Sequence, residues 1–230
     1  MTAASPKTAR LSGVVKLAAA VSVAVIVLAG IWVSGGLITN GFGLAMALTA
    51  LWMALAAVGC GLVAWRRSGL RVPVIGAYLL TAVVAGAWLG RSTLIDDEVN
   101  ERVVKVTPPA PTRSVEGARP ANVLLARGSF EPVAHSAAGA ATAIRTGAGE
   151  RVLTLTSFEV DNGPDLRVYL VAGPARDESE VDDFEDLGAL KGNMGNQQYE
   201  LPRGLDLDRY TTVVIWCRAF SVNFARAPLK

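Results

Sequence analysis

The sequence predicts a protein in two parts, three membrane-spanning helices followed by an antiparallel β domain. Two long uncharged, apolar runs fall within the first 90 residues, a proline-rich segment follows, and strand-like alternation fills most of the remainder. Hydrophobic residues make up 51% of the 230 residues and charged residues 18%, against about 25% charged in a typical soluble protein. This composition disfavours a uniformly water-soluble chain.

Charge is divided unequally between the two parts. Residues 1–92 carry seven basic side chains and no acidic one, whereas residues 93–230 carry 15 basic and 20 acidic side chains. The net charge of +2 therefore combines +7 in the first part with −5 in the second. Because the basic excess lies beside apolar runs and the polar part is mildly acidic, we expect no nucleic-acid partner.

The uncharged runs are long enough for three spans. Between Lys16 and Arg66 lie 49 uncharged residues, and between Arg71 and Arg91 lie 19. A helix needs about 20 apolar residues to cross the hydrocarbon core of a bilayer. The first run therefore holds two spans and the second holds one. We expect helices at about 14–33, 44–65 and 72–89.

The positions of the basic residues predict the orientation of the spans. Basic side chains precede the first span and fill the loop between the second and third, whereas the first loop has no charge. Lysine and arginine near span ends stay in the cytoplasm. We expect residues 1–13 in the cytoplasm and the chain after Arg91 outside the cytoplasmic membrane. The alternative, that residues 1–31 are a cleaved secretory signal, would still leave two spans.

The predicted spans contain no internal Asp, Glu, His, Lys or Arg. Such residues would mark an ion, proton or haem path. The spans are rich in small residues, which suit close helix packing. We expect a membrane anchor with lipid as its partner, and the alternatives are a sensor, a transport unit or a membrane cytochrome.

Residues 92–123 predict a linker. Prolines at 108, 109, 111 and 120 favour an extended, semi-stiff tether, and an acidic cluster at 96–101 is typical of a solvated face.

Residues 124–230 alternate with a period of two, which is typical of strands. Glycine- and asparagine-rich turns separate the candidate strands, and no helical stripe of ten residues interrupts them. Several short strands in about 108 residues predict an antiparallel β-sandwich, with a β-barrel as the alternative. The candidate strands are 129–133, 141–146, 151–160, 166–171, 197–201, 213–219 and 222–227.

Three ordered blocks of this domain carry a family resemblance. They are Asn162-Gly163-Pro164-Asp165-Leu166-Arg167-Val168-Tyr169-Leu170; Leu187-Gly188 to Leu190-Lys191-Gly192-Asn193 with Gly195, Gln197 and Tyr199; and Val214-Ile215-Trp216-Cys217 with Phe220 and Phe224-Ala225. Together with Gly128-Ser129-Phe130 and His135, they make residues 124–229 resemble the DM-thirteen domain, the electron-transfer module of Skeletor-like proteins. The resemblance implies a redox role centred on Cys217, as a bare thiol or as the ligand of a group such as haem.

Cys217 is the only cysteine outside the predicted spans. Its alternation with Val213 and Ile215 predicts that it points into the core, where a cysteine is commonly a small hydrophobic residue with a raised pKa. The other cysteine, Cys60, belongs to the cytoplasmic side of the second span, so we expect no intrachain disulfide. An intermolecular disulfide through Cys217 remains open.

His135 and Met194 are further candidate ligands. His135 is the only histidine in the chain, and Met194 is the only methionine in the β domain. Cysteine, histidine and methionine are axial ligands of haem iron, yet the sequence has no C-x-x-C-H motif for covalent attachment. The alternatives are a loop histidine and a methionine that packs against a turn.

Two other kinds of site find less support. Residues 177–186 hold seven acidic side chains, which could bind calcium, but the spacing lacks the calcium-loop pattern and such a run is commonly only hydrated. The motifs of nucleophilic and metal-dependent hydrolases are missing, so whether the protein is an enzyme stays open.

The sequence therefore favours a membrane-anchored redox module, which its alanine, glycine and arginine content would place in a bacterium. The alternative is a non-catalytic module that binds an envelope partner, with Cys217 as a core residue.

Overall fold

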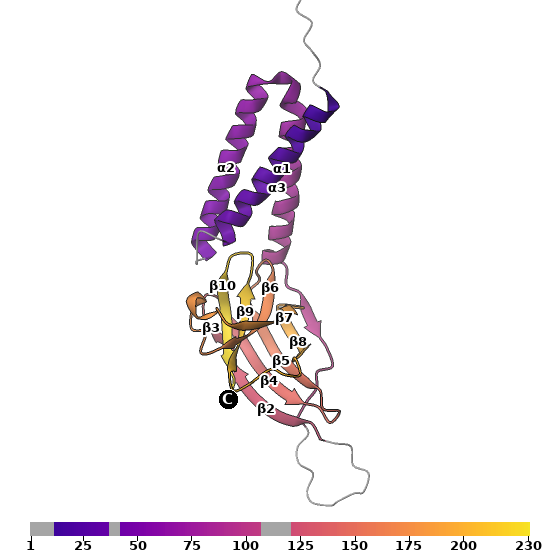
Figure 1. Ribbon diagram of the computed structural model, residues 1–230, viewed down its shortest axis with the longest axis vertical. Helices are drawn as coiled ribbons and strands as arrows, with labels where there is room; N and C mark the ends of the chain where they lie inside the picture. The colour runs from indigo at the N-terminus through magenta and orange to yellow at the C-terminus, as the bar shows by residue number, and fades with distance from the viewer. Residues whose placement is uncertain (1–11, 37–41, 107–120) are drawn as a thin grey trace, which may run out of the picture. The chain divides into compact units, whose positions relative to one another are not determined.

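The computed structural model describes residues 12–36, 42–106 and 121–230 and forms two compact units (Figure 1). Helices up to Trp88 form the first unit, and the chain from Leu89 onwards contributes the strands of the second. The prolines of the expected linker at 108, 109, 111 and 120 lie outside the described residues.

Three long helices make up the first unit: α1 (Gly13–Gly36), α2 (Phe42–Arg66) and α3 (Arg71–Leu94), with a short 3-10 turn η1 (Ser68–Leu70) before α3. Pro73 lies in the first turn of α3, where its missing N–H costs no hydrogen bond. The three apolar segments are 23 or 24 residues long, with mean hydropathies of 2.5, 2.0 and 1.9. By length and composition each helix could cross a membrane. The expected end at 89 marked the end of the apolar run, but α3 continues to Leu94. Backbone hydrogen bonds can extend a helix beyond its apolar residues.

The helices are apolar on nearly all sides. Only 6% of each candidate span is buried inside the unit, and most large apolar side chains face outward. Where α1 and α2 meet, the Trp52 indole lies directly against Gly30, which leaves no room there for a side chain. The Tyr78 hydroxyl donates a hydrogen bond to the Met53 carbonyl at 3.0 Å, which links α3 to α2. Such an outward apolar surface is typical of helices whose solvent is lipid.

Two five-stranded sheets form the second unit. The first has the strand order β1-β8-β5-β4-β2, and the second has the order β3-β10-β9-β6-β7. All pairings are antiparallel except that of β1 with β8. The strands are β1 (Glu98–Asn100), β2 (Val123–Ser129), β3 (Glu131–Pro132), β4 (Ala137–Arg145), β5 (Arg151–Val160), β6 (Leu166–Ala172), β7 (Phe184–Ala189), β8 (Met194–Glu200), β9 (Tyr210–Cys217) and β10 (Val222–Pro228). The described strands do not form a closed barrel, so the β-barrel alternative is wrong for this part of the chain.

The structure differs most from the sequence prediction at three places, and β4, β8 and β9 also begin three or four residues before their expected starts. The expected strand 129–133 is divided, because β2 ends at Ser129 and β3 holds only two residues. The acidic run 177–186, interpreted as a loop, continues into β7, where Phe184 and Asp186 are exposed and Glu185 and Leu187 are partly buried. The expected linker contains β1, so the β unit begins before residue 124.

The central strands β6 and β9 of the second sheet are largely buried on both faces, which explains their long apolar runs. On one face, Ile215 and Leu170 are fully buried. On the other face, Tyr169 and Val214 pack with Val181 of the segment that joins β6 to β7. The first sheet has a buried face around Phe158, whose ring meets Phe130 edge-on at 4.9 Å between centroids.

Candidate functional site

Cys217 is the last residue of β9 and has no exposed surface. It pairs with Leu166 of β6 on one side and with Val222 of β10 on the other. The sequence-based expectation of an inward side chain agrees with this burial. Both cysteines of the chain are free thiols, so Cys217 forms no disulfide with Cys60.

Backbone groups surround the sulfur of Cys217. The thiol donates a hydrogen bond to the Pro164 carbonyl at 3.1 Å. Burial raises the pKa of Cys217 from 9.0 to about 12, and hydrogen bonds from the backbone of Phe220 and Ala219 oppose part of that rise. At neutral pH the group is therefore a neutral thiol, with far less thiolate than an ordinary cysteine.

The loop before β6 brings the Pro164 carbonyl to the sulfur. Gly163 packs so closely on the Phe224 ring that a Cβ atom there would lie 2.7 Å from it. Asp165 then has φ of 57°, the left-handed conformation that aspartate tolerates better than most residues. Glycine and aspartate at these positions thus let the loop fold tightly over the end of β9.

Arg218 ties the same loop to the turn between β9 and β10. Its Nε atom lies 2.7 Å from Asp165 Oδ2, and its backbone N–H donates to the Asp165 carbonyl at 3.1 Å. The Asp165 carboxylate raises the pKa of Arg218 and contributes a small rise to that of Cys217. Arg218 therefore does not activate the thiol. It holds closed the loop that covers the sulfur.

His135 lies at the same end of the second sheet as Cys217. The His135 backbone N–H donates to the Phe224 carbonyl at 3.2 Å, and the two rings stack with centroids 3.8 Å apart. The His135 Nδ1 atom lies 3.3 Å from Asp161 Oδ2. Phe224 is two residues beyond Val222, the strand partner of Cys217, so the loop and β10 place the histidine near the cysteine end.

Met194 belongs to the other sheet. It begins β8, between Glu98 of β1 and Glu159 of β5. The structure therefore brings two of the three predicted ligands to one sheet end and leaves the third in the opposite sheet. Within the described ranges, no group of three or more His, Cys, Asp or Glu side chains is placed to hold a metal ion. Because the Cys217 sulfur is fully buried and already hydrogen-bonded, its surroundings do not fit a haem as they stand.

The acidic segment forms separate ion pairs. Asp183 accepts hydrogen bonds from Arg209 and from the Tyr210 hydroxyl, which lower the pKa of Asp183. Asp186 receives the Arg167 guanidinium at 2.7 Å, and Glu180 pairs with Arg176. The basic partners lie on β6, in the turn before β9 and next to the acidic segment. The sequence of the acidic segment alone therefore could not predict these pairs.

The strand unit matches a known family. Residues 129–229 match the family model described as Electron transfer DM13. These residues are a DM13 domain. No curated protein and no solved structure matches the chain. The domain match confirms the resemblance seen in the three sequence blocks and begins five residues later than expected.

The second block of the DM13 domain forms a buried polar network, which the sequence alone did not predict. The Tyr199 hydroxyl donates to Gln197 Oε1 at 2.7 Å, and Gln197 Nε2 donates to the Gly192 carbonyl at 2.8 Å. Burial raises the pKa of Tyr199 above its usual value. Asn193 joins the network to the start of the unit, because its amide donates to Asp96 Oδ1 at 2.9 Å and its Oδ1 accepts from the Asp97 N–H at 2.7 Å. These side chains hold the loop before β8 in place.

Proposed function

We propose that the chain is an integral protein of the cytoplasmic membrane whose DM13 domain, a β-sandwich, transfers electrons on the outer side, with Cys217 as the redox group. The family description supports the electron-transfer role. The three apolar helices support the anchor, and the lysines and arginines of residues 1–92 support the orientation.

The observation that carries the proposal is the enclosure of a single sulfur by a closed loop. Cys217 is the only cysteine of the DM13 domain, and the Pro164 carbonyl and the Arg218–Asp165 pair hold the loop over it. Oxidation of two thiols to a disulfide releases two electrons and two protons and requires a second sulfur. Because Cys60 belongs to α2, that sulfur would come from a disulfide of a redox partner protein, which is the oxidant. The Cys217 thiolate, after giving up its proton, attacks one partner sulfur; the partner S–S bond breaks, a mixed disulfide forms, and the other partner sulfur leaves as a thiolate that takes up a proton.

The raised pKa of Cys217 sets a condition on this chemistry. A thiolate is the reactive form, and the closed site disfavours it. We infer that the loop opens before the sulfur reacts, which requires the Arg218–Asp165 pair to separate. A role for Cys217 as a cofactor ligand, with His135 as the second ligand at the same sheet end, would need the same opening together with displacement of Phe224.

A second candidate function has its own observation. The complete burial of Cys217 is also what a structural core residue requires. In that case the DM13 domain is a non-catalytic module that binds an envelope partner, and replacement of Cys217 lowers stability while partner binding persists.

The decisive experiment measures thiol reactivity in the folded, full-length protein. In a Cys60→Ala background in detergent, Cys217 is the only thiol. We expect slow reaction with a water-soluble thiol reagent, and a rate about tenfold higher in Arg218→Gln because the loop is less firmly closed. Arg167→Gln is the matched control, since it also removes one arginine from an ion pair with an aspartate.

Absorbance spectra of the same protein, oxidised and reduced, complete the test. A reactive Cys217 that equilibrates with a defined redox buffer supports the thiol role, and a Soret band supports the ligand role. A thiol that reacts only after global unfolding in both arginine variants, with no spectral change on reduction, would leave the structural role as the function of Cys217.

A further inference from the structure

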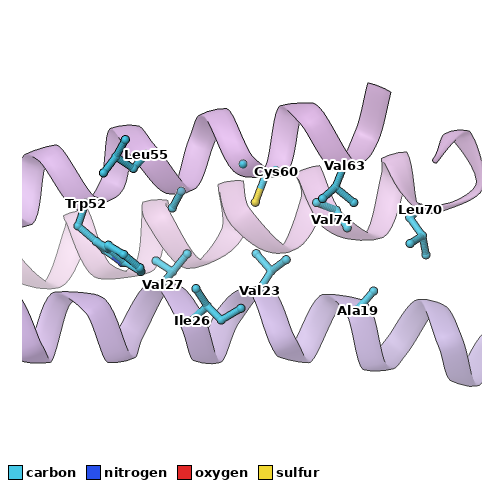
Figure 2. Close-up of a pocket in the computed structure, with 12 residues that line it drawn as sticks. Ala19, Val23, Ile26, Val27, Trp52, Leu55, Cys60, Val63, Leu70 and Val74 are labelled. Carbon is cyan, nitrogen blue, oxygen red and sulfur yellow. The ribbon is translucent and has the colours of Figure 1, made fainter. Parts of the chain in front are cut away.

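The helical unit contains an apolar cavity of about 430 Å³ between α1, α2 and the start of α3 (Figure 2). Such a volume lies within the range of small-molecule binding sites. Trp52 and Val27 lie at one end of the cavity and Leu70 at the other, with the Cys60 sulfur between them (Figure 2). The Trp52 indole, packed on Gly30, forms the wall at its own end.

Basic side chains surround the Leu70 end. Arg66 and Arg67 follow Val63, a cavity residue, by three and four positions, and Arg71 precedes Val74, another cavity residue, by three. Lys16 precedes Ala19, the cavity residue of α1 at this end, by three positions. Three positions are almost one helical turn, so Lys16, Arg66 and Arg71 lie about one turn beyond the lining, and Arg67 directly follows the last residue of α2.

These cations have no acidic side chain of their own unit beside them. All four are exposed, and the first acidic residue of the sequence is Asp96, which lies beyond the helical unit. The strand unit is different, because five of its described arginines form ion pairs with nearby carboxylates. The helical unit therefore presents uncompensated positive charge at the mouth of an apolar cavity.

We propose that this cavity binds one anionic phospholipid, with its phosphate at Lys16, Arg66, Arg67 and Arg71 and an acyl chain along the cavity toward Trp52. The site rests on the proposed insertion of the helices in a membrane. Basic pockets between spanning helices on the cytoplasmic side are suited to anionic headgroups, and the orientation proposed above places these four residues on that side.

The apolar lining and the four basic side chains together determine which kind of ligand fits the cavity. A free phosphate would meet the cations but would leave the apolar lining empty, and a neutral lipid would fill the lining but leave the cations without a counter-charge. A lipid with a negative headgroup fits both parts of the site. The burial of its acyl chain and the pairing of its phosphate with the cations then both contribute favourable free energy of binding.

The test uses the full-length protein in neutral detergent, with melting temperature as the readout. We expect added phosphatidylglycerol to raise the melting temperature by several degrees, and phosphatidylcholine or glycerol phosphate to raise it much less. In Lys16→Gln/Arg66→Gln the response to phosphatidylglycerol should fall to that of phosphatidylcholine. Arg91→Gln/Lys105→Gln removes the same charge away from the cavity and should respond as the unmodified protein does.

A second variant tests the cavity itself. Ala56 lines the cavity, and Ala56→Phe fills part of it while keeping every cation. We expect this variant to lose the response to phosphatidylglycerol, and Cys60 of the unmodified protein to react more slowly with a membrane-permeant maleimide once the lipid is bound.

Equal responses to both phospholipids, or a full response in Lys16→Gln/Arg66→Gln, would overturn the proposal. A separate experiment tests the proposed membrane insertion of the helices. If the helices are not inserted, extraction of membranes with alkaline carbonate, without detergent, should release the protein from the membrane fraction.

Discussion

Leu55 and Leu124 are both about half exposed, at 57% and 47%, yet they belong to units whose surfaces differ in chemical character. Leu55 lies in α2, where nearly every outward side chain is apolar, whereas Leu124 lies at the start of β2 in a unit whose surface carries ion pairs. The exposed fraction of a side chain alone therefore does not predict how a substitution at that position affects this protein. The medium that the side chain faces decides whether exposure is favourable.

The two units also differ in what holds them together. Within the helices, backbone hydrogen bonds are local, and a side-chain hydrogen bond from the Tyr78 hydroxyl links α3 to α2. Within the strand unit, buried aromatic rings, a polar network and ion pairs connect residues far apart in the sequence. We therefore expect substitutions to act by different mechanisms in the two units.

The largest expected effect is in the core of the strand unit. Phe158 is 2% exposed and packs against Phe130. Phe158→Ala should lower the free energy of unfolding by about 3 to 5 kcal/mol, because it removes a buried ring and leaves a cavity. Denaturant unfolding of the full-length protein, followed by tryptophan fluorescence, measures this loss. A change below about 1 kcal/mol would show that the first sheet is not packed as described.

The two leucines provide the direct test of the comparison. Leu55→Asp should disfavour membrane insertion by about 3 kcal/mol, because aspartate is costly at the centre of a span. Leu124→Asp should change the stability of the strand unit by less than about 0.5 kcal/mol, because the new carboxylate faces water. Insertion is measured by the yield in the membrane fraction. Equal tolerance of both substitutions would contradict a lipid solvent for α2.

The next effect is a pH dependence due to Cys217. The folded-state pKa is raised from 9.0 to about 12, so the thiol contributes stability that is fully present below pH 9 and is lost as the pH rises towards 12. Under reducing conditions, the unmodified protein should lose about 2 kcal/mol more than Cys217→Ala between pH 9 and pH 11. Tyrosines with raised pKa values are present in both proteins, so the difference isolates the thiol. Parallel curves would show that the sulfur is accessible to water.

The smallest effect concerns the attachment of β1. Lys191 lies 2.7 Å from Glu101, and the Gln198 N–H donates to the same carboxylate at 2.8 Å, which lowers the pKa of Glu101. Its contribution is therefore present above the ordinary pKa of glutamate and is lost as the pH falls through the lower folded-state value. Glu101→Gln should cost under about 1 kcal/mol at neutral pH, because the pair is partly exposed.

Acid unfolding curves check this prediction. Glu101→Gln should lose less stability than the unmodified protein as the pH falls, while Glu150→Gln, in the exposed turn between β4 and β5, should follow the unmodified protein. A curve for Glu101→Gln that is identical to that of the unmodified protein would show that this pair does not hold the segment after β1.

The sequence predicted the features that depend on local pattern. Uncharged runs gave three helices within a few residues of their ends, since a span is defined by its own composition. Period-two alternation predicted β5 with both its bounds, and the inward direction of Cys217. Three blocks of residues identified the family before any strand was paired.

Tertiary structure decided what depends on distant partners. β1 was hidden in an acidic segment because three residues carry no clear alternation, and only pairing with β8 makes them a strand. Pro164 became the acceptor of the Cys217 thiol, and Phe224 the neighbour of His135, through contacts that span 53 and 89 residues of chain. Local composition fixes which solvent each segment prefers, whereas the surroundings of one sulfur arise only when separate strands and loops pack together.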